Sequence, residues 1–151
     1  MTRPTVAPAL VMLGGILLIV GLPLQWTTVA ATDGSVSISL RGIDYALYDI
    51  ATTAALGLLL VAAAFALAAR RSWGHVLAVV VSLLACFWAG LVVAAAANPS
   101  ENGSLSPGVT VSIGAGAYVL GAGAALALVG AILTFRRRSV AAVRSAAPSS
   151  V

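Results

Sequence analysis

The sequence predicts an all-α membrane protein: a four-helix transmembrane bundle with a small extracytoplasmic antiparallel β-sheet formed by the two outer loops. Of its 151 residues, 61% are hydrophobic and only 8% are charged. A soluble domain carries about a quarter charged residues, which keep its surface solvated. The apolar residues also gather in a few long runs, with arginines at their ends. These observations favour a membrane protein over a soluble one.

Four apolar segments are each long enough to cross a bilayer. A helix rises about 1.5 Å per residue, so roughly 20 apolar residues cross a hydrocarbon core about 30 Å thick. A charged side chain at the bilayer centre costs roughly 2.5 to 3.5 kcal/mol, and none of the four segments contains one. Residues 1–135 therefore form one membrane domain, with outer loops at 25–49 and 98–112. The predicted spans are residues 7–24, 50–69, 76–97 and 113–135.

The first span has a second interpretation as a secretory signal peptide. Arg3 precedes the apolar stretch, and Val29 and Ala31 would occupy the −3 and −1 positions of a cleavage site. The stretch is longer than the apolar region of about 7 to 15 residues that such peptides carry. We therefore expect a retained helix. Cleavage is the alternative, and it would leave three spans in the same orientation.

Arginine placement predicts how the chain threads the membrane, because cytoplasmic loops carry the excess of Lys and Arg. Only Arg41 lies in a predicted outer loop, where acidic residues outnumber it. Both termini are then cytoplasmic. The use of arginine without lysine, with abundant Ala and Gly, suggests the plasma (inner) membrane of a bacterium with a GC-rich genome. The cytoplasmic arginines are Arg3, Arg70, Arg71, Arg136, Arg137, Arg138 and Arg144, and the outer acids are Asp33, Asp44, Asp49 and Glu101.

Residues 136–151 are low in complexity, and we expect a disordered, basic cytoplasmic tail. Basic residues beside a membrane attract anionic lipid at about 1 kcal/mol per charge. The candidate lipid-headgroup contacts are Arg70, Arg71, Arg136, Arg137 and Arg138.

The outer loops carry strand patterns. Val36, Ile38 and Leu40 alternate with serines, and Asp33-Gly34 before them is a hairpin-turn signal. In the second outer loop, residues 109–113 show the same alternation after Pro107-Gly108. Three strands form a more stable sheet than an isolated hairpin. We predict a small antiparallel sheet over the bundle, with its apolar side on the helix ends and its serines and threonines in water.

Small residues at helical spacing predict where the helices pack, because helices in lipid associate through close approach of their backbones. These residues serve packing within the bundle or, as the alternative, a dimer or partner-subunit face. The candidate packing residues are Gly14 and Gly15 in the first span, Ala85 and Ala89 in the third, and Ala117, Gly121, Ala125, Gly123, Ala127 and Ala131 in the fourth.

Several features resemble small four-span membrane proteins of actinobacteria, among them the tryptophan-associated membrane proteins, most of which lack an assigned activity. These features are Trp26 after the first span, the β-rich outer loop, the GIDYALYD entry into the second span and the glycine-rich fourth span. The layout is also similar to the claudin family. The claudin signature includes a cysteine pair in the first outer loop, which has no cysteine here. The resemblance implies a layout and no catalytic residue.

The sequence lacks the residues that several membrane chemistries need. A proton-coupled exporter needs a carboxylate within a span, and a bis-histidine haem site needs two histidines, whereas the chain has only His75. A disulfide-forming enzyme needs cysteine pairs, and the chain has only Cys86. A metal hydrolase needs several ligands close together. We therefore predict a protein that is not an enzyme and has no cofactor or metal site.

Three residues in or near the third span have packing interpretations. His75 reads as a solvated interfacial histidine and Cys86 as a small packing residue. The indole N–H of Trp88 should find a hydroxyl or carbonyl acceptor, either Ser82 or a threonine of the second span.

These inferences favour a non-enzymatic accessory, scaffolding or interaction subunit of the cell envelope. Its partners would be the lipid bilayer and either another membrane protein or a second copy, with no nucleic acid. The alternative is a component of a transporter or channel for lipids or small apolar solutes, which would need no buried charge. A phage-type holin is a third option, which fits the structured outer loops less well.

Overall fold

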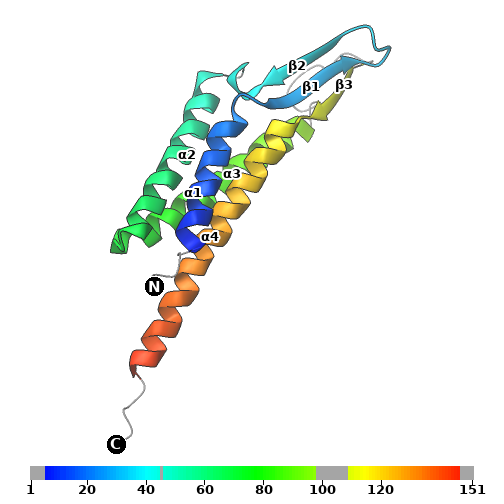
Figure 1. Ribbon diagram of the computed structural model, residues 1–151. Coiled ribbons are helices and arrows are strands. Elements are labelled where there is room, and N and C mark those ends of the chain that lie inside the picture. The colour runs from blue at the N-terminus through cyan, green and yellow to red at the C-terminus, as the bar shows by residue number, and fades with distance from the viewer. Residues whose placement is uncertain (1–5, 45, 98–108, 147–151) are drawn as a thin grey trace, which may run out of the picture.

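The computed structural model describes residues 6–44, 46–97 and 109–146, and the side chains in these ranges except at 96, 97 and 135–146. Within these ranges the chain forms four α-helices and one three-stranded sheet (Figure 1). Arg3, Glu101 and the end of the predicted tail lie outside the described residues.

The helices are α1 (Val6–Gly21), α2 (Leu47–Ala68), α3 (Ser72–Ala97) and α4 (Ala115–Ala146). By length and composition, α2, α3 and the Ala115–Thr134 part of α4 are able to cross a membrane. Helix α1 is equally apolar but has 16 residues. It ends three residues before the predicted boundary because the chain turns at Leu22 and Pro23 to enter the first strand.

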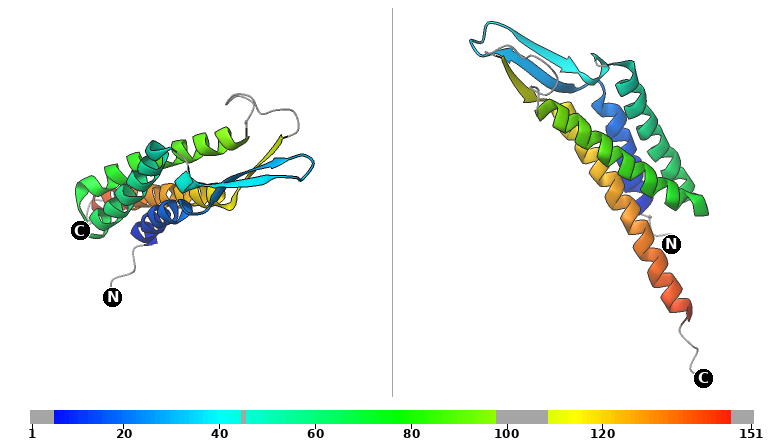
Figure 2. Two further views of the ribbon diagram at one scale, coloured as in Figure 1. Left: turned by 90° about the horizontal axis from the view of Figure 1, so that it is seen from above. Right: turned by 180° about the vertical axis from the view of Figure 1, so that it is seen from behind.

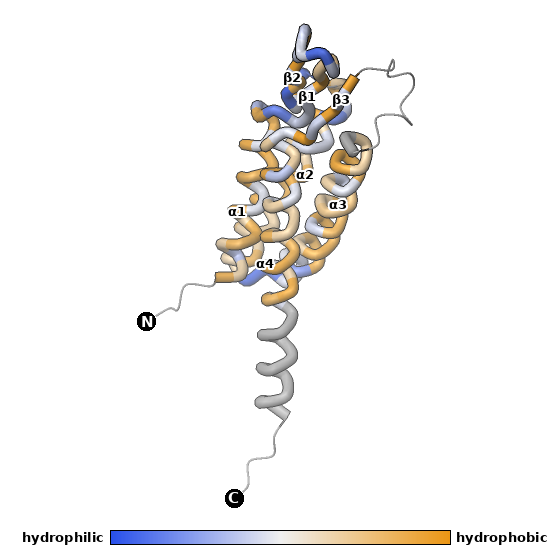
Figure 3. Tube along the Cα trace, turned by 90° about the vertical axis from the view of Figure 1, so that its right-hand side faces the viewer, coloured by the Kyte–Doolittle hydropathy of each residue, from blue (hydrophilic) through white to orange (hydrophobic). Residues whose placement is uncertain are grey.

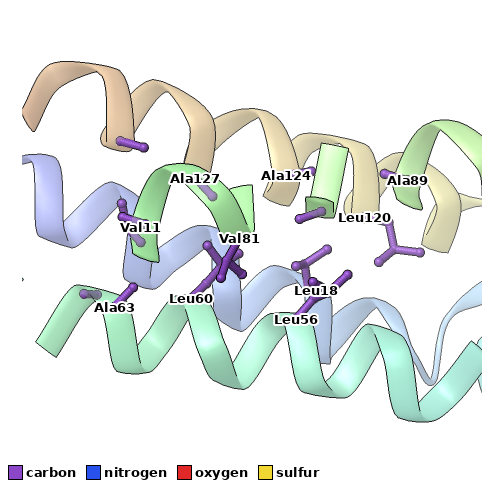
Figure 4. Packing of buried hydrophobic residues seen from close by; sticks show 14 of the residues in the cluster. Val11, Leu18, Leu56, Leu60, Ala63, Val81, Ala89, Leu120, Ala124 and Ala127 are labelled. Carbon is purple, nitrogen blue, oxygen red and sulfur yellow. The ribbon is translucent and has the colours of Figure 1, made fainter. Parts of the chain in front are cut away.

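The helices pack with α1 between α2 and α4, while α3 contacts α2 and α4 from the other side (Figure 2). Large buried side chains meet along the middle of the bundle, where Leu18, Leu60 and Leu120 are fully buried (Figure 4). Alanines and glycines fill the positions where two helices approach most closely. The α2–α3 link and the start of α1 lie at the end opposite the sheet (Figure 1).

Helix α4 continues to Ala146, into the segment expected to be a disordered tail. It also begins at Ala115, after a strand that occupies the first residues of the predicted fourth span. The continuation has a physical reason in its composition, because Ala and Arg are among the strongest helix formers and no Gly or Pro occurs between residues 135 and 146.

The sheet contains β1 (Gln25–Ala31), β2 (Ser37–Arg41) and β3 (Val109–Ile113) in the order β2-β1-β3, with both pairings antiparallel. This confirms the predicted three-stranded antiparallel sheet, whose strands come from residues 25–49 and from the segment just before α4. The pairing with β2 shifts by one residue between Gln25 and Thr27, so Trp26 lies at a β-bulge. Figure 3 shows the sheet beyond the end of the apolar bundle.

The apolar side of the sheet contacts the rest of the protein over only part of its length. Val29 pairs with both Ile38 and Val111, so these side chains share one face. Near the bundle this face is covered, as Thr27 is buried. Toward the β1–β2 turn, Val36 and Ile38 are 57% and 56% exposed. The expected packing on the helix ends therefore stops partway, because the hairpin runs past the bundle (Figure 1).

Candidate helix-packing and interaction site

Helix α1 presents two adjacent glycines to two different helices. A Cβ atom built on Gly14 would lie 2.5 Å from the carbonyl oxygen of Gly123 and 2.8 Å from the Cβ of Ala127. These distances are well inside van der Waals contact, so the backbones of α1 and α4 touch here. Only glycine fits position 14 without a shift of the helices.

The second glycine does the same on the other side. A Cβ built on Gly15 would lie 2.7 Å from the carbonyl oxygen of Gly57 in α2. Gly57 in turn faces Gly15 and Ile19, with 2.9 Å from its built Cβ to the Gly15 carbonyl oxygen. The Gly14-Gly15 pair thus joins α2 to α4 through α1.

The α1–α4 contact extends in both directions from Gly14. A Cβ built on Gly130 would lie 2.9 Å from the Ala7 carbonyl oxygen, and one built on Gly123 would lie 2.9 Å from that of Gly14. The candidate packing alanines that the structure buries in the bundle are Ala85, Ala89, Ala117, Ala127 and Ala131.

Two candidate packing residues of α4 lie elsewhere. Gly121 has open space around the position of its missing Cβ, and Ala125 is exposed. They lie four residues, about one turn, apart on α4, and Gly121 is half-buried. The small residues of α4 therefore serve two faces, one that seats α1 and one that points out of the bundle.

The C-terminal end of α1 is covered by Trp26, the tryptophan that follows the first predicted span. The side chain is only 1% exposed, and its indole Nε1 donates to the Gly21 carbonyl oxygen at 2.9 Å. Glycines make room for the ring, since a Cβ on Gly42 would lie 2.5 Å from its Cε2 and one on Gly116 would lie 2.6 Å from its Cδ1. In the sequence, only these two glycines indicate space for the ring, and no local pattern connects them to Trp26.

The backbone at this end of α1 is also satisfied within the protein. Gly21 O accepts from Leu24 N at 3.2 Å as well as from Trp26, and Leu22 O accepts from Ile43 N at 3.2 Å. Leu24 O accepts from Gly42 N at 3.1 Å. A helix end without water needs such partners, because each unsatisfied polar group in hydrocarbon costs several kcal/mol.

Polar side chains inside the bundle bond within the protein. Trp88 Nε1 donates to Thr53 Oγ1 at 2.9 Å, so the threonine of the second helix is the acceptor rather than Ser82. Ser82 Oγ donates to Val79 O at 3.0 Å, and Thr134 Oγ1 donates to Ala131 O at 2.6 Å. Among the described residues, no group of three or more His, Cys, Asp or Glu could hold a metal ion.

The α2–α3 link carries two of the candidate headgroup contacts, Arg70 and Arg71, both exposed. Arg70 adopts a left-handed conformation with φ 56°. Its N–H donates to Leu67 O at 3.1 Å, and that of Arg71 donates to Ala66 O at 2.9 Å, which is the Schellman pattern of helix ends. Arg136, Arg137 and Arg138 are helical positions of α4, and their side chains are outside the described set.

The β1–β2 turn is held by a carboxylate. Asp33 Oδ1 accepts from the Ser35 hydroxyl at 2.7 Å and from the Ser35 N–H at 3.0 Å, and Gly34 adopts φ 74°. Hydrogen bonds from the Ser35 hydroxyl and then from its N–H lower the pKa of Asp33 from its ordinary value. The turn is therefore built for the ionised form of Asp33.

No protein-family model matches this chain, and a comparison with curated proteins finds no significant match.

Proposed function

We propose that this protein is a non-enzymatic accessory subunit of a bacterial plasma membrane, which crosses the bilayer four times and acts through lateral helix contacts and its outer sheet. The observation that carries the proposal is the division of small residues on α4. Gly123 and Ala127 contact α1, whereas Gly121 has open space around its missing Cβ and Ala125 is exposed. A small-residue face in lipid allows another helix to approach closely.

The proposal treats the short helix α1 as the first span. At about 1.5 Å per residue, its 16 residues reach roughly 24 Å, less than the hydrocarbon thickness. Its outer end is covered by Trp26 and its carbonyl groups bond to the outer-loop backbone. Non-helical backbone is tolerated at membrane depth where protein buries it. These features support a count of four spans, in which the turn and the sheet after α1 complete its passage across the bilayer.

The orientation in the proposal rests on charge. Arg70 and Arg71 lie in the link at one end of the bundle, and Asp33 and Asp44 lie with the sheet at the other (Figure 1). Loops rich in Arg stay in the cytoplasm. The two termini are then cytoplasmic and the sheet faces outward.

Extraction into native-lipid nanodiscs tests the proposal. We expect the wild-type protein to carry a second protein, or a second copy, and Gly121→Leu to release it. Gly90→Leu is the matched control, because Gly90 on α3 also has open space around its missing Cβ. A lone monomer with no companion in native lipid would contradict the proposal. Rapid labelling of Cys86 by a membrane-impermeant thiol reagent would instead support the transport alternative.

A further inference from the structure

Strand β2 is an edge of the sheet that faces away from the helices. Its strand neighbour among the described residues is β1, whereas β3 at the other edge packs beside α3. Figures 1 and 2 show β2 as the outermost strand. An edge strand presents unpaired N–H and C=O groups that another strand is able to bind.

The register shows which groups of β2 point outward. Ala31 N donates to Val36 O at 2.9 Å, so Val36 is a residue that bonds to β1. Ladder bonds in an antiparallel pair recur every second residue, which makes Ile38 and Leu40 the next residues bonded to β1. The backbone N–H and C=O of Ser37 and Ser39 therefore point away from β1.

A carboxylate lies at each end of this open stretch. The N–H of Ser35, before it, donates to Asp33 Oδ1 at 3.0 Å. The N–H of Arg41, after it, donates to Asp44 Oδ2 at 2.8 Å. The open part of the edge is thus limited to Ser37 and Ser39 and has an acidic group at each end.

The side chains of the same stretch are unusual for an edge in water. Val36 and Ile38 are more than half exposed and lie on one face, and the serines lie on the other. Edge strands that avoid partners carry Pro, Lys or inward charge, and β2 has only Arg41 at its end. An added strand with apolar residues at alternate positions would cover Val36 and Ile38.

The chemistry at this edge indicates the kind of segment that would bind it. The carboxylates of Asp33 and Asp44 at the two ends of the open stretch favour basic residues at the ends of an added segment.

We propose that the β2 edge binds an extended segment of a partner protein as a fourth strand, which makes this edge the recognition surface of the proposed accessory function and rests on that function. Backbone bonds to Ser37 and Ser39 hold the segment. Apolar residues at alternate positions contact Val36 and Ile38. Basic residues at the segment ends face Asp33 and Asp44.

A synthetic peptide tests the proposal. The probe is the acetylated and amidated hexapeptide Lys-Thr-Val-Thr-Val-Lys, titrated against the full chain in nanodiscs while the amide resonances are followed by NMR. We expect shifts centred on the Ser37 and Ser39 amides. Ser39→Pro removes one outward N–H without breaking a bond to β1, and should weaken binding at least tenfold. Ser39→Ala keeps the N–H and should bind as the wild type does.

Two variant peptides keep the test valid if Ser39→Pro disturbs the sheet. Methylation of alternate peptide nitrogens, or glutamate in place of both lysines, should each weaken binding at least tenfold. The proposal is overturned if the probe leaves both amides unshifted at millimolar concentration, or if its methylated form binds equally well. Such a result with a companion still present in native-lipid extracts removes only the edge inference, whereas the absence of any companion removes the accessory function.

Discussion

Gly14 of α1 and Gly123 of α4 are in backbone contact, such that a Cβ atom at position 14 would lie 2.5 Å from the Gly123 carbonyl oxygen. With Gly15 against Gly57, this contact holds the first helix between its two neighbours.

Gly14→Ala should destabilise the bundle by about 1–3 kcal/mol, because the added methyl group meets backbone atoms that cannot move aside. Gly121→Ala is the matched control in open space, and should leave stability unchanged or raise it by up to about 1 kcal/mol through better helix propensity. Reversible unfolding in mixed micelles measures both. Equal effects from the two substitutions would show that α1 does not pack on α4 as described.

Trp26→Phe should lower the free energy of unfolding by about 0.5–1.5 kcal/mol, since it removes the indole donor to the Gly21 carbonyl oxygen, which keeps Leu24 N as its other donor. Hydrogen exchange should also become faster at the start of β1. Trp73→Phe serves as the control, because Trp73 is half exposed at the other end of the bundle. Comparable losses from both would argue against a buried role for Trp26.

The bond between Trp88 and Thr53 should couple α3 to α2 by about 0.6 kcal/mol, the average for such bonds between membrane helices. A double-mutant cycle with Trp88→Phe and Thr53→Val measures this coupling free energy. Additive effects of the two substitutions would mean that the bond does not form in the bilayer.

Arg70→Gly should stabilise the α2–α3 turn by about 1 kcal/mol, because an L-residue with φ 56° carries a steric cost that glycine avoids. Arg71→Gly removes the same charge from the neighbouring position and should give no such gain. Thermal unfolding in nanodiscs compares the two. A loss of stability in Arg70→Gly would indicate that the arginine charge outweighs the backbone strain.

The sequence predicted the helices and strands because the patterns that identify them, long uncharged stretches and alternating apolar residues, are local. Uncharged stretches identify α2, α3 and α4, and the alternation around Ile38 identifies β2. The rotation of each helix about its own axis is not determined by the local sequence. Two small-residue stripes of α4 look alike in sequence, and only the packing shows that Gly123 faces α1 while Gly121 faces out.

Long-range contacts explain the remaining differences. The burial of Trp26 depends on Gly42, just after β2, and on Gly116, in the first turn of α4, which lie far apart in the sequence. The end of α1 at Gly21 depends on donors from outside the helix to its carbonyl groups, because the Trp26 indole donates to Gly21 O and Ile43 N donates to the following Leu22 O. Neither the burial of Trp26 nor the end of α1 produces a periodic pattern in the sequence. The choice of Thr53 over Ser82 for Trp88 likewise depends on how α2 and α3 are rotated.

Reporter fusions test the membrane arrangement most directly. A reporter enzyme that folds only outside the cytoplasm is attached after residue 34, after residue 72 and after residue 151. Four spans with cytoplasmic termini predict activity from the first fusion and none from the other two. Robust activity after residue 72 or after residue 151 would contradict the arrangement, and with it the placement of the sheet on the outer side.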